Sequence, residues 1–142
     1  MSLLFLNTRG CIMKKLAIVA LALVIAMAFV GCGPANMLMG TQWYEEYTFG
    51  GISYKETYSF EADNVFKWTS EVTAGSSVNT PKTFTGTWST EGADILITEV
   101  ENAGGVTGKW TVAFDEENKD ILILTRETDN KVLKLNRVKD AE

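Results

Sequence analysis

From residue 40 onward, short runs of alternating apolar and polar residues are separated by clusters of glycine, asparagine, aspartate and serine. The clearest run spans 52–60, where every second residue is large and the residues between are serine, threonine or lysine. A period of two predicts a β-strand with one buried face. No stretch after residue 40 has a helical period of useful length.

Eight such runs predict eight strands, with bounds 40–49, 52–60, 65–72, 82–89, 94–100, 106–114, 121–126 and 131–138. The connections are short and contain no crossover helix, which is typical of an antiparallel up-and-down meander. Closing the meander removes the exposed edges that would otherwise pair with other chains. We therefore expect an all-β, eight-stranded antiparallel up-and-down barrel. Its interior would hold packed side chains or one small ligand.

A different pattern precedes the strands. Lys14 and Lys15 are followed by an uncharged apolar run over 16–30 and then by Gly31 and Cys32. A basic segment before an apolar run of about 7–15 residues predicts an N-terminal secretory signal helix, and Met13 is its expected start. The alternatives are an uncleaved membrane anchor and a soluble secreted protein, but a spanning helix needs roughly 20 apolar residues.

The sequence Phe29-Val30-Gly31-Cys32 resembles the lipobox of bacterial lipoproteins. The resemblance implies cleavage before Cys32 and attachment of fatty acyl chains, palmitate among them, to this cysteine. More than one acyl chain is needed for stable membrane anchoring. The expected organisation is an export signal over 1–31, a lipidated tether over 32–39 and a barrel over 40–142.

In the tether, the apolar residues Met37 to Met39 have two interpretations: they cap the end of the barrel, or they form an extended leader near the membrane.

The barrel region resembles the small bacterial lipocalin-like lipoproteins. Three segments carry the resemblance: 40–43 (Gly-Thr-Gln-Trp), 60–66 (Phe-Glu-Ala-Asp-Asn-Val-Phe) and 86–88 (Gly-Thr-Trp). The family implies a cup for small, often apolar molecules. It also implies a place in the cell envelope, on the periplasmic or cell-surface side, and in the outer membrane if the cell has one, because Gly33 and not aspartate follows the cysteine.

Charge and composition exclude several classes of function. The chain has thirteen basic and eighteen acidic residues, a net charge of −5. Because three basic residues and no acidic residue precede Cys32, the mature chain carries −8. Such a surface repels nucleic acid. The chain has no histidine, and its two cysteines are the lipidated Cys32 and Cys11 in the removed segment. Histidine- or cysteine-based catalysis and zinc sites are thereby excluded, and we expect no enzyme, cofactor or metal.

The acidic loop over 115–120 lacks the ligand spacing and central glycine of an EF-hand calcium loop. We interpret it as a solvated turn.

Glu56 is the polar residue that stands out. The strand period places it on the face of Tyr54 and Tyr58, where a carboxylate is costly unless it has a partner. Glu56 has two interpretations: a polar anchor for a ligand, or a structural residue that forms an ion pair with Arg126 or Arg137 or lies on a strand shifted by a bulge. We favour the structural interpretation, because structural ion pairs are commoner than ligand anchors, and we keep Glu56 as a candidate ligand-binding residue.

Aromatic residues complete the predicted ligand site. Its members besides Glu56 are Tyr54, Tyr58, Trp68, Trp88 and Trp110. Aromatic rings commonly line pockets, although tryptophans also fill the interiors of small barrels. The leading hypothesis is a lipid-anchored binding protein for a small apolar or amphipathic molecule. The alternative is a structural or protein-interaction lipoprotein with a packed barrel, favoured by the run 121–124, which is apolar on both faces and would be covered outside by the tether or a partner.

Overall fold

The computed structural model describes residues 33–75, 79–98, 100–101 and 105–140. The chain divides into two units, Met1–Gly33 and Pro34–Glu142. The predicted export signal over 1–31 and the predicted lipidation site Cys32 lie outside the described residues. The fold below is that of the second unit.

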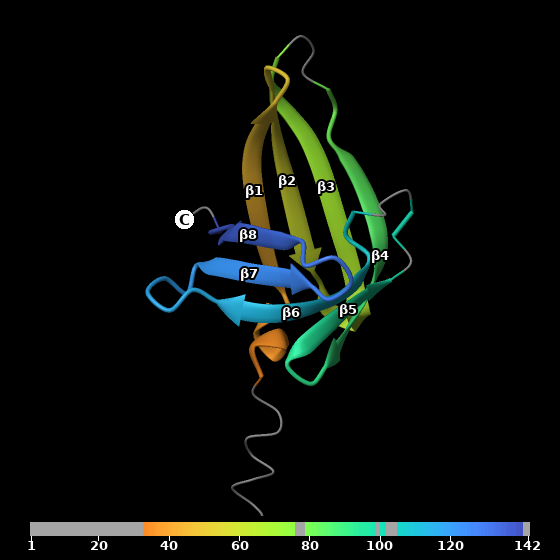
Figure 1. Cartoon of the computed structure of the whole chain (residues 1–142). Coiled ribbons are helices and arrows are strands. Elements are labelled where there is room, and N and C mark those ends of the chain that lie inside the picture. Colours follow the sequence, from red (N-terminus) through yellow and green to blue (C-terminus); the bar gives the residue numbers. More distant parts are fainter. Residues whose placement is uncertain (1–32, 76–78, 99, 102–104, 141–142) are drawn as a thin grey trace, which may run out of the picture. The chain divides into compact units, whose positions relative to one another are not determined.

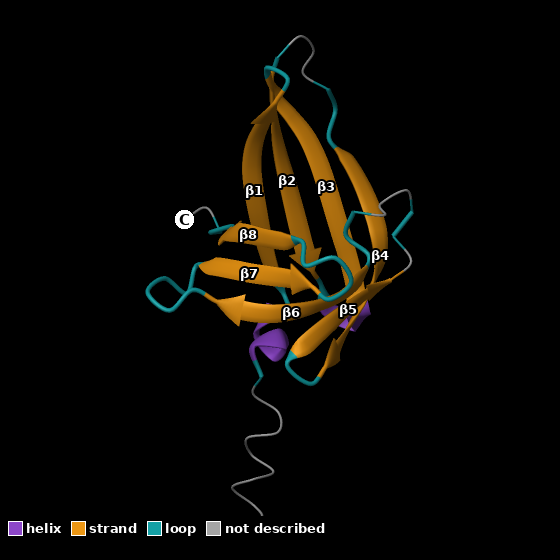
Figure 2. Cartoon of the chain, viewed as in Figure 1, coloured by secondary structure: helices purple, strands orange, loops and turns teal. Residues whose placement is uncertain are grey.

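Eight antiparallel strands form a closed barrel in which each strand pairs with its neighbours in the sequence and the last pairs with the first (Figure 1). The strands are β1 (Thr41–Phe49), β2 (Ile52–Phe60), β3 (Val65–Ala74), β4 (Lys82–Glu91), β5 (Asp94–Thr98), β6 (Gly108–Phe114), β7 (Ile121–Arg126) and β8 (Val132–Arg137). This confirms the predicted fold class. Two short 3₁₀ helices, η1 (Pro34–Leu38) and η2 (Ala62–Asn64), complete the described structure (Figure 2). Within the described residues, no helix is long and apolar enough to cross a membrane.

The β1–β2 hairpin has an unbroken register from Thr41 opposite Phe60 to Phe49 opposite Ile52. Its turn consists of Gly50 and Gly51, with φ values of 60° and 80°. Two consecutive positive φ angles suit the turn twist that two-residue hairpins prefer, and glycine adopts them without a Cβ clash. This turn therefore determines which residues of β1 and β2 face each other.

The barrel closes over a short seam between β1 and β8. Only Trp43 with Arg137 and Tyr44 with Asn136 pair directly. The seam is extended by the amide of Val138, which donates to the carbonyl of Gln42 at 2.9 Å. Trp43 is fully buried beneath it, and the Arg137 guanidinium lies over the Trp43 ring at 5.8 Å.

The strands differ in length, and this difference shapes the barrel. β1 to β4 have nine or ten residues each, whereas β5 to β8 have five to seven. In Figure 1, β6, β7 and β8 run across β1, β2 and β3 at a steep angle, and the ends of the long strands extend beyond them. The inner face of the β1–β2 hairpin tip is thus left open, and Phe49 there is 76% exposed.

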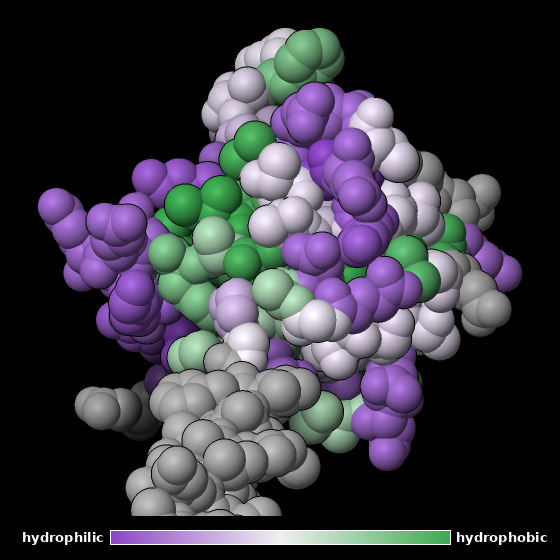
Figure 3. Space-filling model, turned by 60° about the horizontal axis from the view of Figure 1, so that its bottom comes forward, coloured by the Kyte–Doolittle hydropathy of each residue, from purple (hydrophilic) through white to green (hydrophobic). Residues whose placement is uncertain are grey.

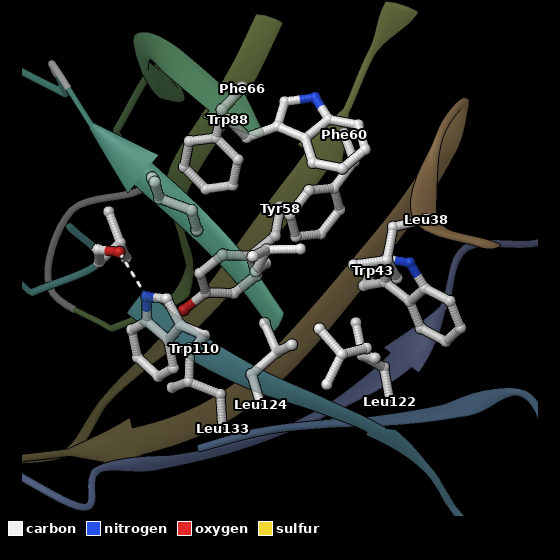
Figure 4. Packing of buried hydrophobic residues seen from close by; sticks show 14 of the residues in the cluster. Leu38, Trp43, Tyr58, Phe60, Phe66, Trp88, Trp110, Leu122, Leu124 and Leu133 are labelled. Atoms are coloured by element: carbon white, nitrogen blue, oxygen red, sulfur yellow. Dashed lines mark hydrogen bonds between the residues drawn. The ribbon is translucent and has the colours of Figure 1, made fainter. Parts of the chain in front are cut away.

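The closed part of the barrel is packed with side chains (Figure 4). Its largest buried rings are those of Trp43, Tyr58, Phe60, Phe66, Trp88 and Trp110, and they meet leucines of β7 and β8. Each buried tryptophan also satisfies its ring N–H, as expected for a ring with one polar atom in a core. The ring N–H of Trp88 donates to the carbonyl of Glu61 at 3.0 Å, and that of Trp110 to the carbonyl of Val106 at 2.9 Å.

Helix η1 closes the barrel end at which the described chain begins. Ala35 and Leu38 are fully buried, whereas Met37 and Met39 are 62% and 60% exposed. The predicted tether therefore caps the barrel through Leu38, and the flanking methionines add apolar surface outside. Figure 3 brings this end forward and shows apolar side chains grouped among polar ones.

The apolar run of β7 contributes to both faces of the sheet. Leu122 and Leu124 are buried in the core, and Ile121 and Ile123 lie half-buried on the outer face.

Gly86 in β4 is required by close packing. A Cβ at this position would lie 2.5 Å from Cγ2 of Val100 and 2.6 Å from the carbonyl oxygen of Thr98. Thr98 at the end of β5 and Val100 therefore occupy the space that a side chain at residue 86 would need.

We expect Gly86→Ala to destabilise the barrel by about 1–3 kcal/mol, because the added methyl group would overlap the Thr98 carbonyl oxygen and the Val100 side chain, and the backbone would have to shift. Urea unfolding measures the effect. Gly105→Ala is the matched control, since its nearest contact would be the flexible Lys131 Nζ at 3.8 Å. Equal stability of the two variants would contradict the packing argument.

Candidate ligand-binding site

A cavity of about 370 Å³ lies where β1 and β8 separate beyond their short seam. One wall comes from β1, β2 and β3 and consists of Glu45, Tyr47, Glu56, Tyr58 and Trp68. The opposite wall consists of Gly105, Val106 and the first residues of β8 with Lys131 before them. The volume is in the range of small-molecule sites, about 300–1,000 Å³.

Strand register brings the polar residues of this cavity together. Glu45 lies directly opposite Glu56 in the β1–β2 pair, and Trp68 lies opposite Tyr58 in the β2–β3 pair. Side chains two residues apart on a strand share a face. Tyr47 therefore faces inward with Glu45.

Glu56 is the centre of the hydrogen-bond network. Its Oε1 accepts a hydrogen bond from the Tyr47 hydroxyl at 2.8 Å. Its Oε2 accepts from the Tyr58 hydroxyl at 3.0 Å and from the Trp68 ring N–H at 3.1 Å. Three donors from three strands thus hold one carboxylate in a fixed position.

Tyr58 joins the two carboxylates. Its hydroxyl lies 2.7 Å from Oε1 of Glu45 as well as 3.0 Å from Oε2 of Glu56. A tyrosine hydroxyl has one hydrogen to donate, so the two glutamates share it. The ring is only 2% exposed. Burial, followed by the charges of Glu45 and Glu56, raises the pKa of Tyr58 strongly, and the hydroxyl stays protonated.

Neither form of the structural interpretation of Glu56 is found. Among the described residues, no lysine or arginine forms an ion pair with Glu56. Arg126 instead contacts Asp129 at 2.6 Å and, mainly through that hydrogen bond, lowers the pKa of Asp129 to about 2. The one irregularity of the β2–β3 pair lies between Ser53 and Tyr54, while the β1–β2 register runs unbroken past Glu56.

The predicted site residues fall into two groups. Glu56, Tyr58 and Trp68 meet in the cavity, and Tyr54 stacks on Tyr47 beside it, with ring centroids 5.2 Å apart. Trp88 and Trp110 lie in the packed core instead.

Sequence reasoning missed Glu45, Tyr47, Lys131 and Val132. The glycine turn at 50–51 was a usable signal for the first two, because it sets Glu45 opposite Glu56.

The opposite wall combines apolar and basic groups. Val132 is 57% exposed at the rim, and Leu133 behind it is buried. Lys131 donates from Nζ to the carbonyl of Gly105 at 3.3 Å. The cavity thus joins an acidic, aromatic wall to a rim with apolar surface.

In the acidic loop over 115–120, side chains accept hydrogen bonds from the backbone of the loop itself. Asp115 Oδ1 accepts from the amides of Glu117 and Asn118, and Asn118 Oδ1 accepts from the amide of Asp120. Within the described part of the chain, no three acidic, histidine or cysteine residues are grouped as metal ligands.

Comparison with protein-family models, curated proteins and solved structures gives no match for this chain.

We expect the stability of the barrel to fall with pH above about pH 10 partly through Tyr47. Burial, and then its hydrogen bond to Glu56, raises the pKa of Tyr47 from 10.0 to about 12. Between these values the unfolded tyrosine has lost its proton while the folded one keeps it, so the unfolded state binds fewer protons and stability decreases as pH rises.

Urea unfolding across this pH range should show a shallower decline in Tyr47→Phe than in the wild type. Tyr44→Phe, on the outer face, controls for loss of a tyrosine outside the cavity. Identical declines in the wild type and Tyr47→Phe would contradict the expected contribution.

Proposed function

We propose that this protein is a lipid-anchored, extracytoplasmic binding protein of the lipocalin-like lipoprotein type, which holds a small amphipathic molecule at the mouth of its barrel. The observation that carries the proposal is the cavity of about 370 Å³ in which donors from three strands hold the Glu56 carboxylate. A fixed polar group beside aromatic surface is the usual composition of a small-molecule site.

The packing of the barrel limits where a ligand can bind. The core rings and leucines fill the closed end, so the supported position is the mouth. There the Trp68 ring stacks on Phe84 with centroids 5.1 Å apart, and both rings are partly exposed. An apolar body would lie against the Trp68 ring, and its polar group would lie near the glutamates.

The remaining parts of the proposal come from the sequence. The basic and apolar segment before Cys32, with its lipobox resemblance, supports export and lipid anchoring in the cell envelope. The barrel capped by η1 would then follow the anchor closely. Binding, and not catalysis, is the activity we propose.

A second candidate is a structural or protein-interaction role in the envelope. Its support is the hairpin tip, where Phe49 is 76% and Tyr47 42% exposed. Large exposed apolar side chains on an uncovered sheet face are typical of protein contacts.

Anchoring is tested by metabolic labelling of expressing cells with a palmitate analogue. We expect the wild-type chain to be labelled and recovered with membranes, and Cys32→Ala to be unlabelled, because the thiol is the acceptor of the lipid. Cys11→Ala is the matched control and should be labelled like the wild type. Labelling of Cys32→Ala would contradict the assignment.

Ligand binding is tested with the full chain in lipid nanodiscs, using calorimetric titration of water-soluble aryl-alkyl alcohols, amines and acids and subtracting empty nanodiscs. We expect binding by the wild type and a loss of at least about tenfold in affinity in Gly105→Trp. Gly105 lines the cavity, and the nearest atom to a Cβ at this position would be Lys131 Nζ at 3.8 Å, so a large ring there fills the mouth. Lys134→Trp, on the outer face of β8, is the control. Absence of binding by every compound would refute the proposed function.

A further inference from the structure

We propose that the cavity selects an organic cation, a small molecule with an ammonium group on an apolar body, and that Glu45 and Glu56 hold this group between them. The inference rests on the proposed function and adds the charge class of the ligand.

The negative charges of the two carboxylates lie close together and are not neutralised by a basic side chain among the described residues. Glu45 and Glu56 lie directly opposite each other on β1 and β2, a placement that is unfavourable for like charges in an antiparallel sheet. Among the described residues, neither forms an ion pair. A cation placed between them would remove the repulsion and gain attraction to both.

The hydrogen bonds of the pair are also incomplete. Both carboxylate oxygens of Glu56 accept hydrogen bonds. Glu45 accepts through Oε1 only, from the Tyr58 hydroxyl, whose one hydrogen it shares with Glu56. Within the described part of the chain, Oε2 of Glu45 receives no hydrogen bond. A primary ammonium has three N–H donors and no acceptor, so it complements a carboxylate pair that lacks donors, and charge-assisted hydrogen bonds of this kind are the strong ones.

Aromatic rings line the same cavity as the two carboxylates. Tyr47, Tyr58 and Trp68 line the cavity with the carboxylates, and Tyr54 stacks on Tyr47. Aromatic faces attract ammonium groups and offer nothing comparable to an anion. Partial burial strengthens this attraction because fewer water molecules screen it.

Lys131 is the basic residue of the cavity lining, and it does not neutralise the pair. Its Nζ is engaged with the carbonyl of Gly105 on the opposite wall, and it forms no ion pair with either glutamate among the described contacts. The acidic wall and the single lysine leave the cavity with a surplus of negative charge.

The test uses three compounds with the same apolar body: 4-phenylbutylamine, 4-phenylbutanol and 4-phenylbutyrate. Calorimetric titration into the full chain in nanodiscs, against empty nanodiscs, gives the three affinities. We expect the amine to bind at least about tenfold more tightly than the alcohol, and the carboxylate to bind most weakly.

Glu56→Gln and Glu45→Gln retain the shape of the side chain and remove the charge. Each should reduce amine affinity by about tenfold while the alcohol changes by less than about threefold. Glu46→Gln removes an equal charge from the opposite face of the same strand and should leave both affinities unchanged. Circular dichroism confirms that the variants are folded.

The outcomes separate the two proposals. Binding of none of the three compounds would refute the proposed function and this inference together. Binding of the alcohol as tightly as the amine, or equal loss of both ligands in Glu56→Gln, would retain the binding function and overturn cation selection. An equal effect of Glu46→Gln would show general attraction to an acidic protein and would likewise overturn it.

Discussion

The short closure between β1 and β8 is the constraint on which the rest of the structure depends. Two residue pairs join the strands, and Trp43 packs beneath the seam with Arg137 over its ring. On one side of the seam the barrel is closed, capped by η1 and filled with side chains. On the other side β1 continues to the hairpin tip paired with β2 but not with β8, and the separation of β1 from β8 creates the cavity.

Tyr58 connects these two halves. Its ring belongs to the packed core and its hydroxyl lies at the cavity between Glu45 and Glu56. A side chain whose ring is held by close packing has few alternative rotamers, so the hydroxyl is positioned before any ligand arrives. Such preorganisation lowers the entropy cost of binding. The rigidity of the packed core therefore contributes directly to the geometry of the cavity.

The sequence predicted the fold to the level of strand bounds, because alternation and turn residues are local signals. It also predicted the face of Glu56 and Tyr58, since the face follows from parity along a strand. Depth along the barrel does not follow from parity, and for that reason Trp88 and Trp110 in the core looked the same as Trp68 at the mouth. The opposite wall at 105–106 and 131–133 depends on where unequal strands separate, which is a long-range property that no single run encodes.

The distribution of favourable and unfavourable contacts argues that the mouth is built for something other than stability. Burying each large apolar side chain of the core contributes roughly 1.5–3 kcal/mol, and the opposed glutamates cost on the order of 0.2–1 kcal/mol. The barrel can therefore carry the unfavourable pair without losing its fold. Departures from local sequence preferences in otherwise consistent folds concentrate at functional positions. Glu45 and Glu56 are such a departure, and they lie where β1 and β8 separate and the packed barrel opens.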